Sequence, residues 1–146
     1  MTKKLIILFF FITACGYQPI HLNKGEVFFK EISLIGDKKI NRKIVSSLNI
    51  KINKEITPNN QIIFESSKNI QITSKDSKGQ PKTFRTSIDI KLTILDNNKI
   101  SKERLFSKNF SYQNIDNKYD FFNYQKNIEN NLVNKILDNI NIFLKL

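Results

Sequence analysis

The chain has 146 residues, a length that fits one domain with a single hydrophobic core. It contains 1 cysteine, which excludes stabilisation by a disulfide bond within the chain. The formal net charge of +11 favours anionic partners. Lysine (21), asparagine (19) and isoleucine (24) are all encoded by A/T-rich codons, so codon usage offers a second explanation for the basic character.

The N-terminal segment has the features of a cleaved export signal, in the expected order. Lys3 and Lys4 precede an unbroken apolar run at residues 5–12. A helix that spans a bilayer needs about 20 apolar residues, so this run is too short to be a lasting anchor. Its length is typical of the apolar region of a signal peptide.

The apolar run ends in the pattern of a bacterial lipobox, Ile12-Thr13-Ala14-Cys15. An aliphatic residue and two small residues fit the signal peptidase, and the cysteine thiol is the nucleophile that takes up diacylglycerol. The new amino group is then acylated in turn. Several acyl chains on one residue anchor a protein essentially permanently, at about 0.8 kcal/mol per buried CH₂. The alternatives are an ordinary signal peptide with a chance cysteine, or a buried N-terminal strand.

These features predict a signal peptide at residues 1–14, a lipid-bearing tether at 15–25 and one domain at 26–146. Gly16 follows the cysteine, whereas an aspartate there retains enteric lipoproteins in the inner membrane. We therefore expect the periplasmic side of the outer membrane. Nucleic acid is a poor candidate for the anionic partner, because the protein is expected to be exported. An anionic lipid is a better one, because lysine and arginine bind its phosphates.

The first elements of the domain are a strand and a helix. Residues 26–35 are rich in Val, Ile and Phe, which predicts a strand. Asp37 can cap a helix in which Ile40, Ile44 and Leu48 recur every four residues, with Ile52 as a further candidate member.

Two strands follow the break at residues 57–60. Residues 61–74 give a weaker strand signal, because the polar stretch 65–69 interrupts the alternation and suggests a bulge. After a turn cluster at 75–81, residues 84–94 alternate strictly between apolar and polar side chains. This is the clearest strand in the chain.

A tight hairpin is predicted at residues 96–99, because asparagine tolerates the positive φ of a primed turn. The return strand at residues 101–112 places Phe106, Phe110 and Tyr112 on one face, which we expect to be buried. The other face is polar, as in an antiparallel sheet with one solvated side.

A final helix is predicted from Asp120, its expected cap, almost to the C-terminus. Ile128, Leu132, Ile136 and Ile140 form its apolar row. The predicted fold is therefore α+β: a small mixed four-stranded sheet with two helices packed on one face, in the order β-α-β-β-β-α.

The sequence contains no motif that groups residues for catalysis or for metal binding. His21 is the single histidine and lies in the tether, without a second histidine or a free cysteine to complete a metal site or a nucleophile–base pair. Asp116 and Asp120 suit the start of a helix. We expect no enzymatic activity, no metal and no cofactor other than the covalent lipid on Cys15. An aromatic cluster at residues 119–124 is predicted to pack into the core, with a binding patch as the alternative.

Most of the mature chain resembles the lipopolysaccharide-assembly lipoprotein family LptE, in the form found in alphaproteobacteria. The resemblance rests on the order and spacing of several short segments: Cys15-Gly16-Tyr17-Gln18-Pro19-Ile20, Asn41-Arg42-Lys43-Ile44, Phe84-Arg85, Tyr119-Asp120-Phe121 and Ile128-Glu129-Asn130-Asn131-Leu132. It implies a domain that sits in the lumen of the outer-membrane barrel LptD, helps the barrel to assemble and binds lipopolysaccharide.

Only Cys15 carries over from the resemblance directly, as the acylated anchor. Basic residues make the family's lipopolysaccharide contacts, which directs attention to Arg85, with Lys82 and Lys78 near the preceding turn. Arg85 alternates with Phe84, so it is expected to face away from the helices. An ordinary exposed role is the alternative for this residue. The alternative for the whole chain is a structural or transport-auxiliary envelope lipoprotein with no role in lipopolysaccharide transport.

Overall fold

A computed structural model describes residues 27–48, 50–55 and 59–145. Within these ranges the chain forms strands and helices in the following order: β1 (Val27–Phe29), β2 (Glu31–Gly36), α2 (Lys38–Ser47), β3 (Ile50–Ile52), β4 (Asn60–Lys75), β5 (Pro81–Asp96), β6 (Lys99–Gln113) and α3 (Lys118–Lys145). No helix in the described part of the chain is long and apolar enough to cross a membrane.

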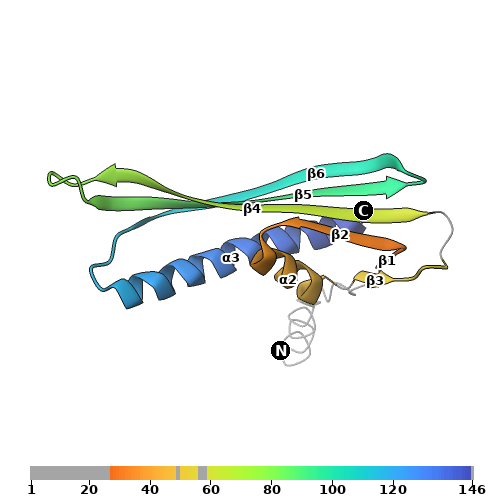
Figure 1. The fold of residues 1–146 in the computed structure, drawn as a ribbon, viewed down its shortest axis with the longest axis horizontal. Helices are drawn as coiled ribbons and strands as arrows, with labels where there is room; N and C mark the ends of the chain where they lie inside the picture. The colour runs from red at the N-terminus through yellow and green to blue at the C-terminus, as the bar shows by residue number, and fades with distance from the viewer. Residues whose placement is uncertain (1–26, 49, 56–58, 146) are drawn as a thin grey trace, which may run out of the picture.

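The main sheet has four strands in the order β2-β4-β5-β6. β2 runs parallel to β4, while β4, β5 and β6 are antiparallel neighbours, so the sheet is mixed. Both α2 and α3 lie on the same face of the sheet (Figure 1). The predicted α+β class and the layer arrangement are confirmed.

The single strand predicted at residues 26–35 is wrong, because the structure divides it at Lys30. β1 leaves the main sheet and pairs in parallel with β3, which places Val27 opposite Ile50. The division is fixed by Asn60, whose backbone oxygen and side-chain oxygen both accept from the Lys30 N–H. β3 was also missed, because its ladder joins residues far apart in the sequence.

Helix α2 begins at the residue predicted, but it ends before Ile52, the furthest residue that the sequence pattern offered for this helix. The Asp37 carboxylate accepts from the backbone N–H groups of Lys39 and Ile40 at 2.8 and 3.0 Å, which confirms it as the N-cap. The helix stops at Ser47, and Leu48 is its extended C-cap. Ile52, a candidate helical residue, therefore lies in β3.

Strand β4 is continuous through the polar stretch where a bulge was expected. Its register with β5 is unbroken from Asn60 opposite Asp96 to Ile72 opposite Phe84, and the irregularities come later, between Ile72 and Lys75. The polar residues need no bend, because those facing the helices find partners there. Ser66, for example, is buried and donates to the Asn41 side chain at 2.7 Å.

The hairpin between β5 and β6 is confirmed, with Asn97 and Asn98 at φ of 50° and 63°. Phe106 and Tyr112 of β6 are buried, as predicted. Phe110 was expected to be buried but is exposed, since α3 does not cover this part of β6 completely.

Helix α3 begins two residues before the predicted cap. The Asn117 side chain accepts from the N–H groups of Tyr119 and Asp120, at 2.9 and 3.3 Å. Asn117 therefore caps α3, and Asp120 lies in the first turn, where its charge still suits the helix dipole. Asparagine and aspartate cap equally well, so the sequence alone did not decide between them.

The core lies between the helices and the helix-facing side of the sheet. The fully buried apolar residues come from both layers: Ile40, Ile44, Ile62, Phe64, Ile88, Ile90, Leu92, Val133, Ile136 and Ile140. The apolar stripe of each helix and the alternate residues of β5 are thus placed as their periodicity predicted.

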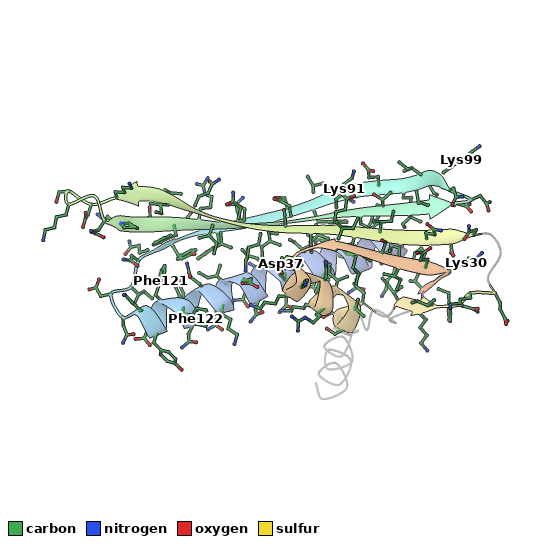
Figure 2. The ribbon with its side chains drawn as sticks, viewed as in Figure 1. Lys30, Asp37, Lys91, Lys99, Phe121 and Phe122 are labelled. Atoms are coloured by element: carbon green, nitrogen blue, oxygen red, sulfur yellow. The ribbon has the colours of Figure 1, made fainter. Side chains whose placement is uncertain are left out.

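The aromatic cluster at the start of α3 is divided between core and surface. Phe121 packs against Phe84 at a ring distance of 5.0 Å, and Tyr124 meets Tyr112 edge-on. Tyr119, Phe122 and Tyr124 are 73%, 62% and 38% exposed, so core packing was wrong for these three. In Figure 2, Phe121 lies nearer the sheet than Phe122.

Candidate functional site

The outer face of the sheet, turned away from the helices, is polar over most of its area. Side chains alternate across β5, so that Thr86, Ile88 and Ile90 face the helices and their odd-numbered neighbours face outward. The register places hydroxyl, amide and charged residues together on this outer face: Ser67, Asn69, Gln71, Arg85, Ser87, Asp89, Lys91, Glu103, Ser107, Asn109 and Ser111.

Arg85 lies on this outer face, as expected from the sequence. Its register partners are Gln71 on β4 and Ser111 on β6. The guanidinium Nε donates to the Ser111 hydroxyl at 3.1 Å, and the side chain is exposed. No acidic residue of the described chain forms an ion pair with it, so the remaining N–H donors of the guanidinium are available to an anion.

The three predicted lipopolysaccharide-binding residues do not form one cluster. Lys82 and Arg85 are three residues apart on the same strand, so alternation puts them on opposite faces of the sheet. Lys78 lies in the turn between β4 and β5, where its backbone N–H donates to Asp76 at 2.8 Å. Arg85 is thus the only one of the three that faces outward from within the sheet.

Cys15, the predicted lipidation site, lies outside the described residues. It stays a prediction from the lipobox.

A charged cluster that the sequence analysis missed joins α2, β4 and α3. Glu129 of α3 accepts from Lys39 at 2.8 Å and from Lys68 at 3.1 Å. Lys68 also lies 4.0 Å from Asp37, the cap of α2. The Glu129 side chain is only 11% exposed, so its charge depends on these two lysines.

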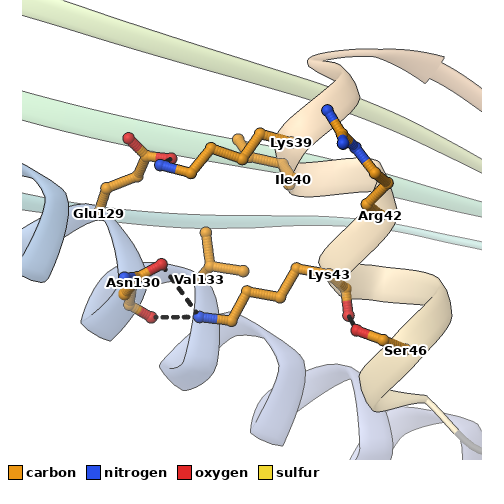
Figure 3. Close-up of a pocket in the computed structure, with 8 residues that line it drawn as sticks. All are labelled: Lys39, Ile40, Arg42, Lys43, Ser46, Glu129, Asn130 and Val133. Carbon is orange, nitrogen blue, oxygen red and sulfur yellow. Dashed lines mark hydrogen bonds and ion pairs between the residues drawn. The ribbon is translucent and has the colours of Figure 1, made fainter.

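A cleft of about 430 Å³ separates α2 from α3 beside this cluster (Figure 3). Ile40 and Val133 are its apolar lining residues, and charged and polar side chains from both helices line the rest. Lys43 reaches across it and donates to the backbone and side-chain oxygens of Asn130, at 3.2 and 3.4 Å. The pKa of Lys43 is lowered by burial and by the neighbouring positive charge of Lys39.

Burial alone would raise the pKa of Glu129, but the hydrogen bonds and positive charges of Lys39 and Lys68 outweigh it. The pKa therefore lies below its ordinary value of 4.5. The pKa of Asp37 is also lowered, mainly by the backbone N–H of Ile40. Both groups are thus held as carboxylates, and the cluster fixes the positions of α2, β4 and α3 relative to one another.

One signal in the sequence could have revealed this cluster. Glu129 occupies a position four residues before Val133 and eight before Leu137, in a row that is otherwise apolar. A carboxylate in a row that packs against a neighbouring helix needs a cationic partner.

The cluster predicts a pH dependence of stability. Because the Glu129 pKa is lowered on folding, its contribution is complete above pH 4.5 and is lost as the pH falls through the folded value. We expect Glu129→Gln to lower the free energy of unfolding at pH 7 by about 1 to 3 kcal/mol. Urea unfolding should show a smaller difference from the parent protein at pH 3.

The control for this variant is Glu31→Gln, which removes an exposed carboxylate that makes no ion pair among the described residues. Equal losses in the two variants at pH 7 would show that the cluster adds nothing specific.

The described ranges contain no group of three or more His, Cys, Asp and Glu side chains that could hold a metal ion.

No protein-family model matches this chain, and no curated protein sequence matches it. Solved structures do match. The rare lipoprotein B from Shewanella oneidensis aligns over 75% of this chain and 89% of its own, with a TM-score of 0.59 and 13% identity. The chain shares the fold of this lipoprotein.

Two further structures support this likeness. A minor lipoprotein from Acinetobacter baumannii aligns over 81% of this chain and 92% of its own, with a TM-score of 0.56 and 15% identity. Lipoprotein B from Nitrosomonas europaea covers 80% and 82%, with a TM-score of 0.54 and 13% identity. In each of these alignments the shared fold covers most of this chain and most of the other chain.

Proposed function

We propose that this chain is a lipid-anchored lipoprotein on the periplasmic side of the outer membrane, where it serves lipopolysaccharide transport and assembly. In this proposal it has no catalytic activity. It occupies the lumen of the barrel LptD, assists the assembly of that barrel and binds lipopolysaccharide. The observation that carries the proposal is the fold, which matches solved bacterial lipoproteins over most of their length. The lipobox ending at Cys15 and the resemblance to the LptE family agree with it.

The outer face of the sheet supports a position inside a barrel. The lumen of a large outer-membrane barrel is polar, since lipid-facing and lumen-facing residues alternate along its strands. The hydroxyl and amide side chains on the outer face of β4, β5 and β6 can form hydrogen bonds to such a wall. α2 and α3 lie over the other face (Figure 1) and cover most of its apolar side chains, although Ile70, Ile72 and Phe110 stay exposed.

The proposal is tested by purifying the tagged, mature protein from solubilised outer membrane and identifying what accompanies it by mass spectrometry. A barrel of the lipopolysaccharide-export type in equal amount is the expected result. Recovery of the protein alone would contradict the proposal. Recovery with the components of another envelope complex would favour the alternative, an auxiliary lipoprotein without a role in lipopolysaccharide transport.

Arg85 is the residue through which we expect the outer face to bind a lipid phosphate. Arg85→Ala should weaken lipopolysaccharide binding about tenfold, the effect of losing one charge-assisted hydrogen bond. Because Arg85 is exposed, the thermal unfolding temperature should stay within a few degrees of the parent value. Pull-down by immobilised lipopolysaccharide measures the first effect, and circular dichroism the second.

Arg104→Ala is the matched control, because it removes the same charge at another place. Arg104 lies against the rings of Phe106 and Phe143, at 5.4 and 5.5 Å, rather than beside Arg85. Unchanged binding by Arg85→Ala, or an equal loss in both variants, would exclude a specific role for Arg85.

A further inference from the structure

Strand β4 has an edge that no other described strand covers. β2 pairs with β4 only from Gln61 to Ser66, whereas β4 continues to Lys75. Beyond Ser66, one edge of β4 pairs with β5 and the other has no strand beside it in the described part of the chain. Figure 1 shows β4 running well past the end of β2.

At the end of β2, beside Ser66, the chain turns away from the edge of β4. Gly36, the last residue of β2, has a φ of 97° and lies against the backbone of Ser66. The next residue, Asp37, donates its N–H to the Ser66 carbonyl at 3.1 Å and caps α2. β2 therefore cannot lengthen along β4 without dismantling the start of α2.

Two of the helix-facing side chains beside the open edge are apolar and uncovered. Ile70 and Ile72 share the face of the buried Ile62 and Phe64, but they are 44% and 49% exposed. The residue between them, Gln71, points to the polar outer face. Any strand added here would meet aliphatic side chains on one face of the sheet and polar side chains on the other.

Helix α3 has an uncovered apolar residue, Phe122, on the face that carries Glu129 and Val133. Phe122 lies two helical turns before Glu129, which contacts Lys39 of α2 and Lys68 of β4, and three turns before the buried Val133. These positions share one face of α3. α2 covers that face in the middle of α3 but does not reach its first turns (Figure 1), where Phe122 is exposed.

Outside the Glu129 cluster, basic residues outnumber acidic ones around this region: Lys75, Lys78, Arg85 and Lys126 against Asp76 and Asp89. Lys68 is neutralised by Glu129, but Lys75, Lys78 and Lys126 form no ion pair within the described residues. A second copy of the chain paired along this edge would bring another set of the same unpaired lysines to this region, which is unfavourable. An acidic occupant would be attracted.

We infer that the edge of β4 from Ser67 to Ile72 binds an extended, acidic segment of a partner protein, which joins the sheet as an additional strand. Backbone hydrogen bonds to the open edge supply affinity, and aliphatic side chains at alternate positions of the segment cover Ile70 and Ile72. Carboxylates at its other positions point to the outer face, on the side of Arg85, and those at its end near Ile72 approach Lys75 and Lys78. This inference holds whether or not the chain binds lipopolysaccharide.

The test uses the chain with Cys15→Ala, which keeps every described residue, and a synthetic peptide of alternating valine and glutamate that spans Ser67 to Ile72. Amide hydrogen exchange is followed by NMR. Without peptide, alternate amides of this stretch should exchange quickly, because they point to the open edge. With peptide they should be protected, whereas a peptide of alternating valine and lysine should have no effect.

The variant Ile70→Ser/Ile72→Ser should weaken the valine–glutamate peptide about tenfold or more, through the lost apolar contact. Ile100→Ser, at an exposed position of β6, should bind it normally. The inference would be overturned if the peptide gave no protection, if it protected β6 instead, or if the lysine peptide bound equally well. It would also be overturned if the amides were already protected without peptide, by another part of the chain or by a dimer detected in sedimentation.

Discussion

The Gly36→Ala variant is expected to lose roughly 3 kcal/mol or more of folding stability, a large share of the about 5 to 15 kcal/mol that is typical of a domain. Gly36 has a φ of 97°, and a Cβ placed on it would overlap the backbone oxygen of Ser66. That oxygen accepts from Asp37 and cannot move away without disrupting the junction of β2 with α2. Strain at positive φ and a backbone clash therefore act together.

Gly79→Ala is the control for Gly36→Ala, because Gly79 has a similar φ of 80° but a Cβ added to it would meet nothing within 4 Å. It should cost only about 1 to 2 kcal/mol, the strain of the left-handed conformation alone. Urea unfolding followed by circular dichroism measures both variants. Equal destabilisation would show that the contact with Ser66 is unimportant.

The Cys15→Ala variant is expected to lose lipid attachment completely. The lipobox requires a thiol, and alanine has no nucleophile to take up diacylglycerol. Mass spectrometry of the N-terminal peptide should show acyl chains on the parent protein and none on the variant. In fractionated cells the variant should be released from the membrane or accumulate with its signal peptide uncleaved.

Thr13→Ala is the matched control for Cys15→Ala, because it keeps a small residue at its position in the lipobox and leaves the cysteine in place. It should be acylated normally. An unmodified Cys15 in the parent protein would reject the lipoprotein assignment, while leaving the fold as described.

The elements that the sequence predicted correctly are those determined by local patterns. The alternation of residues 84–94, the asparagines at the β5–β6 turn and the Asp37 cap each depend on residues close in sequence. The apolar row of α3 was correct for the same reason. The expected outward orientation of Arg85 followed from its alternation with Phe84.

The errors arose where distant segments decide the structure. The division of residues 26–35 at Lys30 depends on Asn60 and on the pairing of β1 with β3. The polar stretch of β4 stays straight because Ser66 and Lys68 find partners on α2 and α3. No periodicity within β4 contains this information.

The sequence by itself determined the lipobox, the α+β class and the face on which each regular element is apolar, because periodicity and capping are local properties of the chain. Only the tertiary structure decided the pairings of β2 with β4 and of β1 with β3, where β2 ends and which charges meet around Glu129. The physical reason is that hydrogen bonds between strands and ion pairs between helices join residues far apart in the sequence, which meet only when the core forms.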